Sequence, residues 1–189
     1  EGAEDSQEMG RDDVRSHGVT DRDVVVGIAA SGRTPYVIGA LQEAKAVGAK
    51  TISLSCNPNA LISEGVDVAI NVVVGPEVLT GSTRLKAGTA QKLVLNMLTT
   101  AAMIRLGKVY GNLMVNVQAT NKKLQERVKR IIMEVTGVSY SEAEKLARLA
   151  EGDAKTAILM RLTGTSKEEA ARLLNVTKGR IREAIQQFG

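Results

Sequence analysis

The chain has 189 residues and a net charge of +4 at pH 7; 43% of its residues are hydrophobic and only 2% are aromatic. This length fits one substantial domain with a smaller one, and the scarcity of aromatic rings excludes a stacking platform for single-stranded nucleic acid. A single cysteine, Cys56, and a single histidine, His17, exclude a structural zinc cluster and a disulfide framework within the chain, so no metal site is expected. One reduced thiol, and the lack of an apolar run long enough to span a bilayer, predict a cytoplasmic protein with no membrane partner.

The positive charge lies in the C-terminal part of the chain. Residues 1–110 carry 11 basic and 12 acidic side chains, a net charge of −1, whereas residues 111–189 carry 14 and 9, a net charge of +5. A basic patch of this kind can bind nucleic acid. The solvated faces of short helices produce the same excess, and we favour that explanation.

Three apolar runs rich in Val and Ile alternate with helical patterns in the first half of the chain. The runs DVVVGIAA, KTISLSCN and VDVAINVVV are typical of strands buried on both faces, and they cover residues 23–30, 50–57 and 66–74. Residues 5–17 are polar, as in an exposed helix, and residues 34–48 have helical spacing and end at a glycine. This order predicts an α/β fold with a three-layer, doubly wound parallel sheet and right-handed crossovers.

The second half of the chain is predicted to be mostly helical. Residues 75–107 read as a loop and one long helix, and the second half of this helix is apolar nearly all round. We therefore expect it to be buried in the domain centre or in a dimer interface. An amphipathic helix and four shorter ones are expected at residues 121–137, 141–151, 153–162, 166–174 and 178–188. Ser141 and Ser166 each stand three residues before a glutamate, the spacing of a capping box. The expected domains are residues 1–118 and a small all-helical subdomain over 119–189.

The loop after the first predicted strand has the features of a phosphate-binding turn. In open α/β sheets, ligands bind where a strand ends and the next helix begins, and a helix N-terminus offers free N–H groups to an anion. Ser31 and Thr34 supply hydroxyl groups, Gly32 allows close approach of the backbone, and Arg33 supplies charge. A helix that is simply capped by Ser or Thr is the alternative.

A second loop, GPEVLTGSTRLKAGTAQKL, also follows a strand and precedes a helix. Its hydroxyl and cationic side chains include Ser82, Thr83 and Lys86, and Glu77 lies at its start. Two such loops at one edge of a sheet predict a site for a phosphorylated small molecule, with Glu77 or another carboxylate near the reactive part of the ligand. A polar first turn of the long helix is the alternative.

Five stretches, EGAEDS, GIAASGRTPYV, SCNPN, GPEVLTGSTRLKAGTAQKLVLNML and GKVYGNLMVNV, resemble the N-acetylmuramic acid 6-phosphate etherases of the sugar isomerase (SIS) domain superfamily. The stretches are long and uninterrupted, and the resemblance covers essentially the whole chain. It implies an incomplete SIS domain, a homodimer, and cleavage of the lactyl ether of N-acetylmuramic acid 6-phosphate with water to give N-acetylglucosamine 6-phosphate and D-lactate. Such enzymes serve cell-wall recycling in the bacterial cytoplasm and need no cofactor.

The reaction that the resemblance implies is an elimination followed by a hydration. A base removes the proton at C2, next to the aldehyde of the open-chain sugar, and an acid protonates the ether oxygen as lactate leaves C3. Two carboxylates in different environments can fill these roles, each contributing roughly 10²–10⁴-fold to the rate. The resemblance assigns Glu4, in EGAEDS, as the base at C2. Capping of the first helix is the alternative role for this carboxylate.

The resemblance also implies that part of the site lies upstream of EGAEDS. In the family, a second glutamate, a Gly/Ser-rich sugar-phosphate loop and the first strand of the sheet precede this motif. The chain as given therefore looks like the C-terminal two-thirds of an etherase. We expect that it does not turn over by itself, and that an associated upstream segment would restore the reaction.

Other function classes fit parts of the chain. Residues 166–186 read like a helix-turn-helix whose second helix carries Lys178, Arg180 and Arg182, as in a sugar-phosphate-sensing regulator that binds DNA. We favour a small helical bundle that packs on the SIS domain, so nucleic acid is not an expected partner. An aldose–ketose isomerase would share the phosphate loops and the base at C2, and a pure sugar-phosphate sensor would need only the loops.

Overall fold

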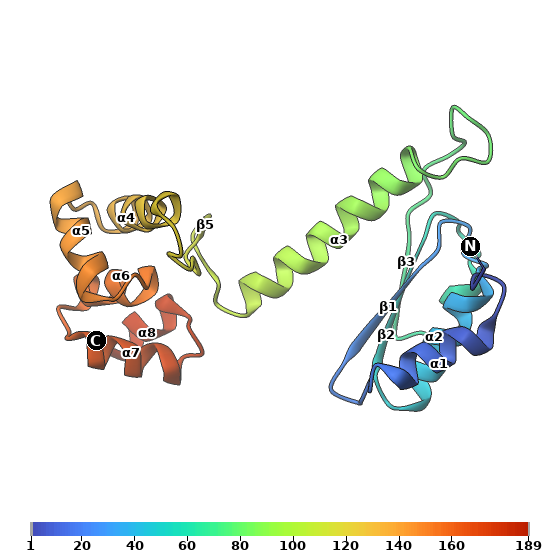
Figure 1. The fold of residues 1–189 in the computed structure, drawn as a ribbon, viewed down its shortest axis with the longest axis horizontal. Helices are drawn as coiled ribbons and strands as arrows, with labels where there is room; N and C mark the ends of the chain where they lie inside the picture. Colours follow the sequence, from blue (N-terminus) through green and yellow to red (C-terminus); the bar gives the residue numbers. More distant parts are fainter. Residues whose placement is uncertain (1, 189) are drawn as a thin grey trace. The chain divides into compact units, whose positions relative to one another are not determined.

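The chain folds into two compact units, residues 1–97 and 98–189. The structure, shown in Figure 1, is a computed structural model and describes residues 2–188. The first unit is an α/β unit and the second is mainly helical, which confirms the predicted fold class. The predicted domain boundary at residue 118 stays a prediction.

The first unit contains a three-stranded parallel sheet in the order β1-β2-β3. The strands are β1 (Val24–Ile28), β2 (Lys50–Ser55) and β3 (Val68–Asn71), each within a predicted run but shorter than it. In the register, Ile28 of β1 pairs with Leu54 of β2, which in turn pairs with Ile70 of β3. Residues that follow the strands in each run, such as Ala29, Cys56 and Val72, leave the sheet at its carboxyl edge, whereas Val66 of the third run precedes β3.

Helices α1 (Gln7–Ser16) and α2 (Pro35–Ala46) lie on the same side of the strands, as Figure 1 shows. Two glycines bring them into backbone contact: a Cβ added at Gly10 would lie 2.1 Å from the Tyr36 carbonyl oxygen, and one at Gly39 would lie 2.0 Å from that of Gln7. Any side chain at either position would push the helices apart.

The two faces of the sheet differ in how they are covered. Leu41 of α2 packs with Ala29 and Val25 at β1, so α2 covers the face on which these residues lie. On the opposite face Val24 and Val68 keep 59% and 49% of their surface exposed. One helical layer of the predicted three-layer arrangement is therefore present on the sheet, and the second face offers apolar surface to a further layer.

The long helix α3 (Lys86–Arg105) carries most of its apolar side chains on the surface of the chain. Only Ala87 and Val94 are buried in it, whereas Met97 is 62% exposed and Ile104 53% exposed. The expectation that its second half lies in the centre of a domain is therefore wrong for this chain. An interface with a second copy stays a prediction.

The second unit has a short antiparallel pair of strands followed by five helices. The strands are β4 (Val109–Tyr110) and β5 (Leu113–Met114), and the helices are α4 (Lys122–Thr136), α5 (Tyr140–Leu149), α6 (Ala154–Thr163), α7 (Lys167–Val176) and α8 (Ile181–Phe188). Their core holds the fully buried side chains Val115, Val128, Ile132, Ile158 and Leu159. The predicted all-helical subdomain is thus present.

The helices α5 to α8 form two copies of one helical hairpin, 27 residues apart. Ser139 caps α5 and Ser166 caps α7, and each side chain accepts a hydrogen bond from the backbone N–H three residues later, at 3.3 and 3.2 Å. The expected capping box at Ser141 is therefore wrong, because the helix begins two residues earlier. At Ser166 the expected hydrogen bond from the Glu169 N–H to the serine hydroxyl is present.

The turns of the two hairpins also match. Glu151 and Lys178, the two non-glycine residues with positive φ among residues 2–188, have φ values of 51° and 52°, and a glycine with positive φ follows each. The α5–α6 and α7–α8 hairpins are therefore one structural unit used twice.

Candidate functional site

The two loops expected to bind a ligand meet at the carboxyl edge of the sheet. Cys56, just after β2, donates its backbone N–H to the Ala30 carbonyl at 3.0 Å, and its Sγ lies 3.9 Å from the Ala87 carbonyl oxygen. Ala30 begins the first loop, and Ala87 lies in the first turn of α3, which the second loop enters. The geometry therefore brings the loops together around Cys56, as the parallel topology predicts.

Gly32 shapes the first loop. Its φ is +72°, and an added Cβ would lie 2.4 Å from the Cβ of Ala60. Its N–H donates to the Ala29 carbonyl at 2.9 Å, and its carbonyl accepts from the Ile62 N–H at 3.0 Å. Only glycine combines this left-handed backbone with so close a neighbour. The loop is thus held in one conformation by the segment that follows β2.

The side chains around Gly32 point to the surface of the chain. Ser31 and Arg33 are exposed and Thr34 is half-buried. The Ser31 hydroxyl accepts from the Arg33 N–H at 3.3 Å. Thr34 is the N-cap of α2, but its side chain makes no capping hydrogen bond. The simple Thr-capped helix is therefore not what the structure contains, and Pro35 at the first helical position has no N–H to satisfy.

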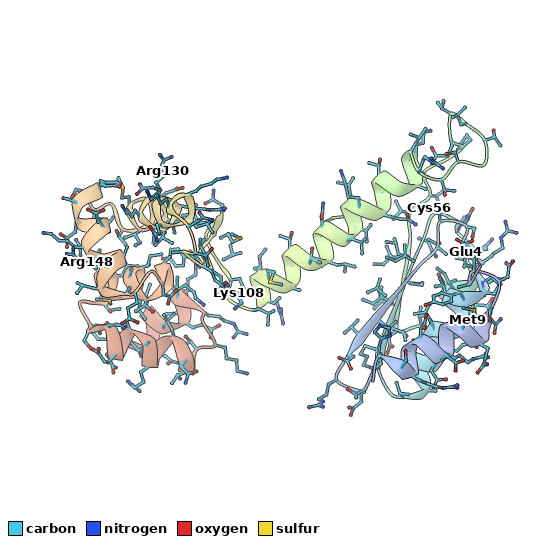
Figure 2. All side chains as sticks on the ribbon, viewed as in Figure 1. Glu4, Met9, Cys56, Lys108, Arg130 and Arg148 are labelled. Atoms are coloured by element: carbon cyan, nitrogen blue, oxygen red, sulfur yellow. The ribbon has the colours of Figure 1, made fainter. Side chains whose placement is uncertain are left out.

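Glu4 lies at the N-terminus of α2. Its carbonyl accepts the Tyr36 N–H at 3.0 Å, which ties the EGAEDS segment to the first turn of that helix. Figure 2 shows Glu4 at the same end of the first unit as Cys56. The N-cap of α1 is Ser6, whose hydroxyl accepts from Met9 at 3.2 Å. Glu4 is thus not the cap of the first helix, its side chain is exposed, and its catalytic role stays a prediction.

Glu77 occupies the N-terminus of α3. Its carboxylate oxygens accept the backbone N–H groups of Lys86 and Ala87 at 2.9 and 3.0 Å. The hydrogen bond from Ala87, followed by that from Lys86, is the main cause that holds the pKa of Glu77 below its ordinary value. Both oxygens thus cap the helix and occupy the N–H groups of Lys86 and Ala87, and a contact of Glu77 with the ligand stays a prediction.

In the second loop, the side chains of Ser82, Thr83 and Lys86 are the groups left to contact a ligand. Ser82 closes a turn with the Leu79 carbonyl at 3.0 Å, and the Thr83 carbonyl accepts from the Gly88 N–H at 2.9 Å. Thr83 and Lys86 are exposed and Ser82 is half-buried. A phosphate group at this loop would therefore depend on hydroxyl and ammonium groups rather than on the N–H groups of Lys86 and Ala87.

Comparison with known proteins identifies the unit that carries this edge. Residues 8–101 match the SIS domain family. Over 158 residues, 84% of its length, the chain is 62% identical to the N-acetylmuramic acid 6-phosphate etherase of Mycolicibacterium smegmatis. Over the same length it is 60% and 61% identical to the proteins of that name from Geobacillus thermodenitrificans and Bacillus cereus. Residues 8–101 belong to the SIS domain family.

The matches cover 53–54% of each of these relatives, so the chain spans about half the length of the curated relatives it matches. The resemblance to the etherases that the sequence motifs predict is confirmed over 84% of the chain. No helix among residues 2–188 is long and apolar enough to cross a membrane. Within the same residues, no three His, Cys, Asp or Glu side chains are grouped so that they could hold a metal ion.

One residue at this edge of the SIS unit was not selected from the sequence. Asn57 donates its side-chain amide to the carbonyls of Ala30 and Ser31, at 3.0 and 3.1 Å. It therefore holds the first loop from the side of β2. The SCNPN motif contains this residue, but its role depends on a contact across 26 positions that spacing alone does not reveal.

Proposed function

We propose that this chain is part of an enzyme that cleaves the lactyl ether of N-acetylmuramic acid 6-phosphate to N-acetylglucosamine 6-phosphate and D-lactate. Such an enzyme is a carbon–oxygen lyase that serves peptidoglycan recycling and amino-sugar catabolism. Identity of about 60% to etherases over 84% of the chain supports this function. The observation that carries it is the position of Glu4, which is tied to the N-terminus of α2 and is not used as a helix cap.

In the proposed reaction Glu4 takes the proton from C2 of the open-chain sugar. The electron pair then forms the C2–C3 double bond as the C3–O bond to lactate breaks, and an acid protonates the leaving oxygen. Water adds to C3 and a proton returns to C2, so the atoms of one water molecule appear in the products. Ser31, Arg33, Thr34, Ser82, Thr83 and Lys86 are proposed to position the sugar phosphate, and Gly32 to shape the loop.

The acid is the group this chain is not expected to supply. The family resemblance places a second glutamate upstream of EGAEDS, and the chain matches about half of each relative. Loss of one positioned acid–base group costs roughly 10²–10⁴-fold in rate. We therefore propose that residues 1–189 alone bind the sugar phosphate weakly and release D-lactate only when an upstream segment is present.

The test measures D-lactate released from N-acetylmuramic acid 6-phosphate. The chain is assayed alone and after co-expression with the part of the Mycolicibacterium relative that the match does not cover. We expect release only in the second case, and a loss of about 10²-fold or more in Glu4→Gln. Glu8→Gln, an exposed carboxylate on α1, is the matched control. Equal release by Glu4→Gln, or a ketose product in place of lactate, would refute the proposal.

We also propose that the complete protein is a homodimer in the cytoplasm. Leu93 and Met97, exposed apolar residues four positions apart on the part of α3 that belongs to the first unit, support a second copy as the partner, because an apolar stripe of this kind is usually covered. The free Cys56 thiol is compatible with a reducing compartment. Sedimentation of the complete protein tests the dimer, and Met97→Glu is expected to shift it toward monomer.

A DNA-binding regulator is less well supported by the structure. In a helix-turn-helix, α8 would be the recognition helix, but the same hairpin also occurs as α5–α6. There Ala154, Ala157 and Ile158 of α6 are fully buried in the core of the unit. Because the second helix of α5–α6 packs into the core, the same hairpin shape in α7–α8 does not indicate DNA binding. An isomerase or a sensor would be revealed by product analysis.

A further inference from the structure

The two helical hairpins of the second unit hold equivalent cavities. A cavity of about 430 Å³ lies against the α5–α6 turn, and one of about 320 Å³ lies against the α7–α8 turn. Five positions of the first cavity, moved by 27 residues, line the second: Glu144, Ala147, Arg148, Glu151 and Gly152 become Ala171, Leu174, Asn175, Lys178 and Gly179. The hollows therefore arise from the repeat itself, and only their side chains distinguish them.

The charged residues that line the two cavities differ in their balance. The first cavity has two cationic and two anionic side chains, a net charge of zero. Its Lys129 is held by Glu144 at 2.8 Å, and its Glu151 pairs with Lys167 at 2.7 Å. The second cavity is lined by Lys108, Lys155 and Lys178 and by a single carboxylate, Asp153, a net charge of +2. Helix packing explains the shape of both cavities but not this excess of positive charge in the second.

The carboxylate in the second cavity already has a structural role. Asp153 caps α6 and accepts the Thr156 hydroxyl at 2.6 Å as well as the backbone N–H groups of Lys155 and Thr156. None of the three lysines forms an ion pair with a carboxylate among residues 2–188. The ammonium group of Lys108 donates only to the Asn116 amide oxygen, at 3.3 Å. Three cations thus surround one hollow without a paired anion.

Lys155 is the central one of the three. A Cβ added at Gly179 would lie 2.9 Å from its Nζ, so the ammonium group lies against the turn between α7 and α8. Burial is the largest cause of the lowered pKa of Lys155. The negative charge of Asp153 raises this pKa, whereas the positive charge of Lys108 lowers it further. A half-buried cation beside another cation is unfavourable unless an anion joins them. The residue 27 positions before Lys155 is Val128 of α4, which lines the first cavity, so a cavity of this kind forms without a lysine at that place.

We propose that Lys108, Lys155 and Lys178 form a binding site for a small phosphate-bearing molecule in the cavity beside the α7–α8 turn. Three ammonium groups around a concave site suit the charge of a phosphate group, which lysine binds as a point charge. The site is independent of the proposed etherase function, since its residues all lie in the second unit. Figure 2 labels Lys108, which precedes β4, and Arg148 on the first hairpin.

A small molecule fits these observations better than nucleic acid does. Duplex DNA is bound by cations spread over an exposed face, along which the phosphates can lie. Here Lys108 and Lys155 are half-buried and line a hollow. Arg180, which the helix-turn-helix hypothesis would use, is paired with Glu183 at 3.1 Å and also contacts the Arg105 carbonyl. The cationic groups that define the site thus face a cavity.

The test is a titration of the ¹⁵N-labelled chain, residues 1–189, with inorganic phosphate at constant ionic strength. We expect saturable shifts of the Gly179 and Lys178 amides and none of the Gly152 amide, which occupies the same place in the first hairpin. Lys155→Gln is expected to raise the dissociation constant about tenfold, equivalent to about 1.4 kcal/mol. Lys145→Gln, an exposed lysine on α5, is the matched control and should change it less than about twofold.

A second variant separates loss of the site from loss of folding. Lys178→Asn removes a charge at a positive φ that asparagine tolerates well, so it should weaken phosphate binding while the Gly152 region of the spectrum stays unchanged. The absence of saturable shifts at Gly179 would overturn the proposal, as would equal weakening by Lys145→Gln. It would also be overturned if a short DNA duplex, but not phosphate, shifted the Lys178 and Arg182 amides with a steep dependence on salt.

Discussion

Substitution of Gly32 tests whether the first loop has the conformation that the proposed site requires. Gly32→Ala places a side chain at φ +72°, where an L-residue costs about 1–2 kcal/mol. The added Cβ would also lie 2.4 Å from the Cβ of Ala60 and 2.9 Å from its Cα, so the loop or the backbone after β2 must move. Such overpacking adds about 1–3 kcal/mol. We expect the free energy of unfolding of the first unit to fall by about 2–5 kcal/mol.

Gly18→Ala is the matched control for this prediction. Gly18 has a similar φ of +64° and lies in the same unit, but nothing lies within 4 Å of an added Cβ. It should therefore cost only the backbone term of about 1–2 kcal/mol. The difference between the two variants isolates the contact between Gly32 and Ala60.

The assay follows labelling of the Cys56 thiol as urea is increased. Cys56 is the single cysteine of the chain and is half-buried beside the first loop, so its reactivity reports on the first unit alone. With a slope of about 1–3 kcal/mol per molar urea, the two variants should differ by about 1 M in their midpoints. Equal midpoints for Gly32→Ala and Gly18→Ala would show that the loop is not packed against Ala60, and the reasoning about this site would fail.

Three further predictions follow from single contacts. The pKa of the Cys56 thiol is raised first by burial and then by the negative charge of Glu77. Glu77→Gln removes that charge, so the thiol pKa should fall and alkylation of Cys56 at neutral pH should accelerate. Ser139→Ala should cost about 1 kcal/mol in the urea unfolding of the second unit, and Ser141→Ala almost nothing, because only Ser139 caps α5. Asp67 has its pKa lowered to about 2, chiefly by the Thr51 N–H. It therefore contributes stability that is present above its unfolded pKa of about 3.9 and is lost as the pH falls toward 2; unfolding of Asp67→Asn should depend less on pH in that range.

The sheet and α2 could be predicted because local and tertiary signals agree. Strand runs rich in Val and Ile end at Ser, Asn and Gly, and Pro35 begins a helix as its fixed φ favours. The exposure of α3 in this chain could not be predicted in the same way. Apolar residues all round a helix predict a partner but do not identify it, and within this chain Met97 and Ile104 remain exposed.

The candidate site was only partly predictable from the sequence, since polar residue types do not reveal which contacts are already made. Glu77 and the hydroxyl groups of its loop look equally available in the sequence. In the structure the Glu77 carboxylate takes two N–H groups of α3, and Asn57 holds the Ser31 carbonyl from another segment. The choice between a capping and a catalytic carboxylate depends on such contacts. For Glu4 they exclude the capping role, because Ser6 is the cap of α1, and the catalytic role stays a prediction.

The repeat in the second unit provides an internal reference for separating packing from function. Residues that both hairpins need for folding recur at 27-residue spacing: the capping serines 139 and 166, and the left-handed Glu151 and Lys178. A residue type that appears in only one copy is not required by the hairpin and needs another explanation. The capping serines and the glycines that follow Glu151 and Lys178 pass this comparison as structural residues. The charge at the left-handed position does not: Glu151 of the first copy is replaced by Lys178 in the second, which lines one cavity with Lys108 and Lys155, and a ligand that carries negative charge is the explanation that their unpaired surroundings support.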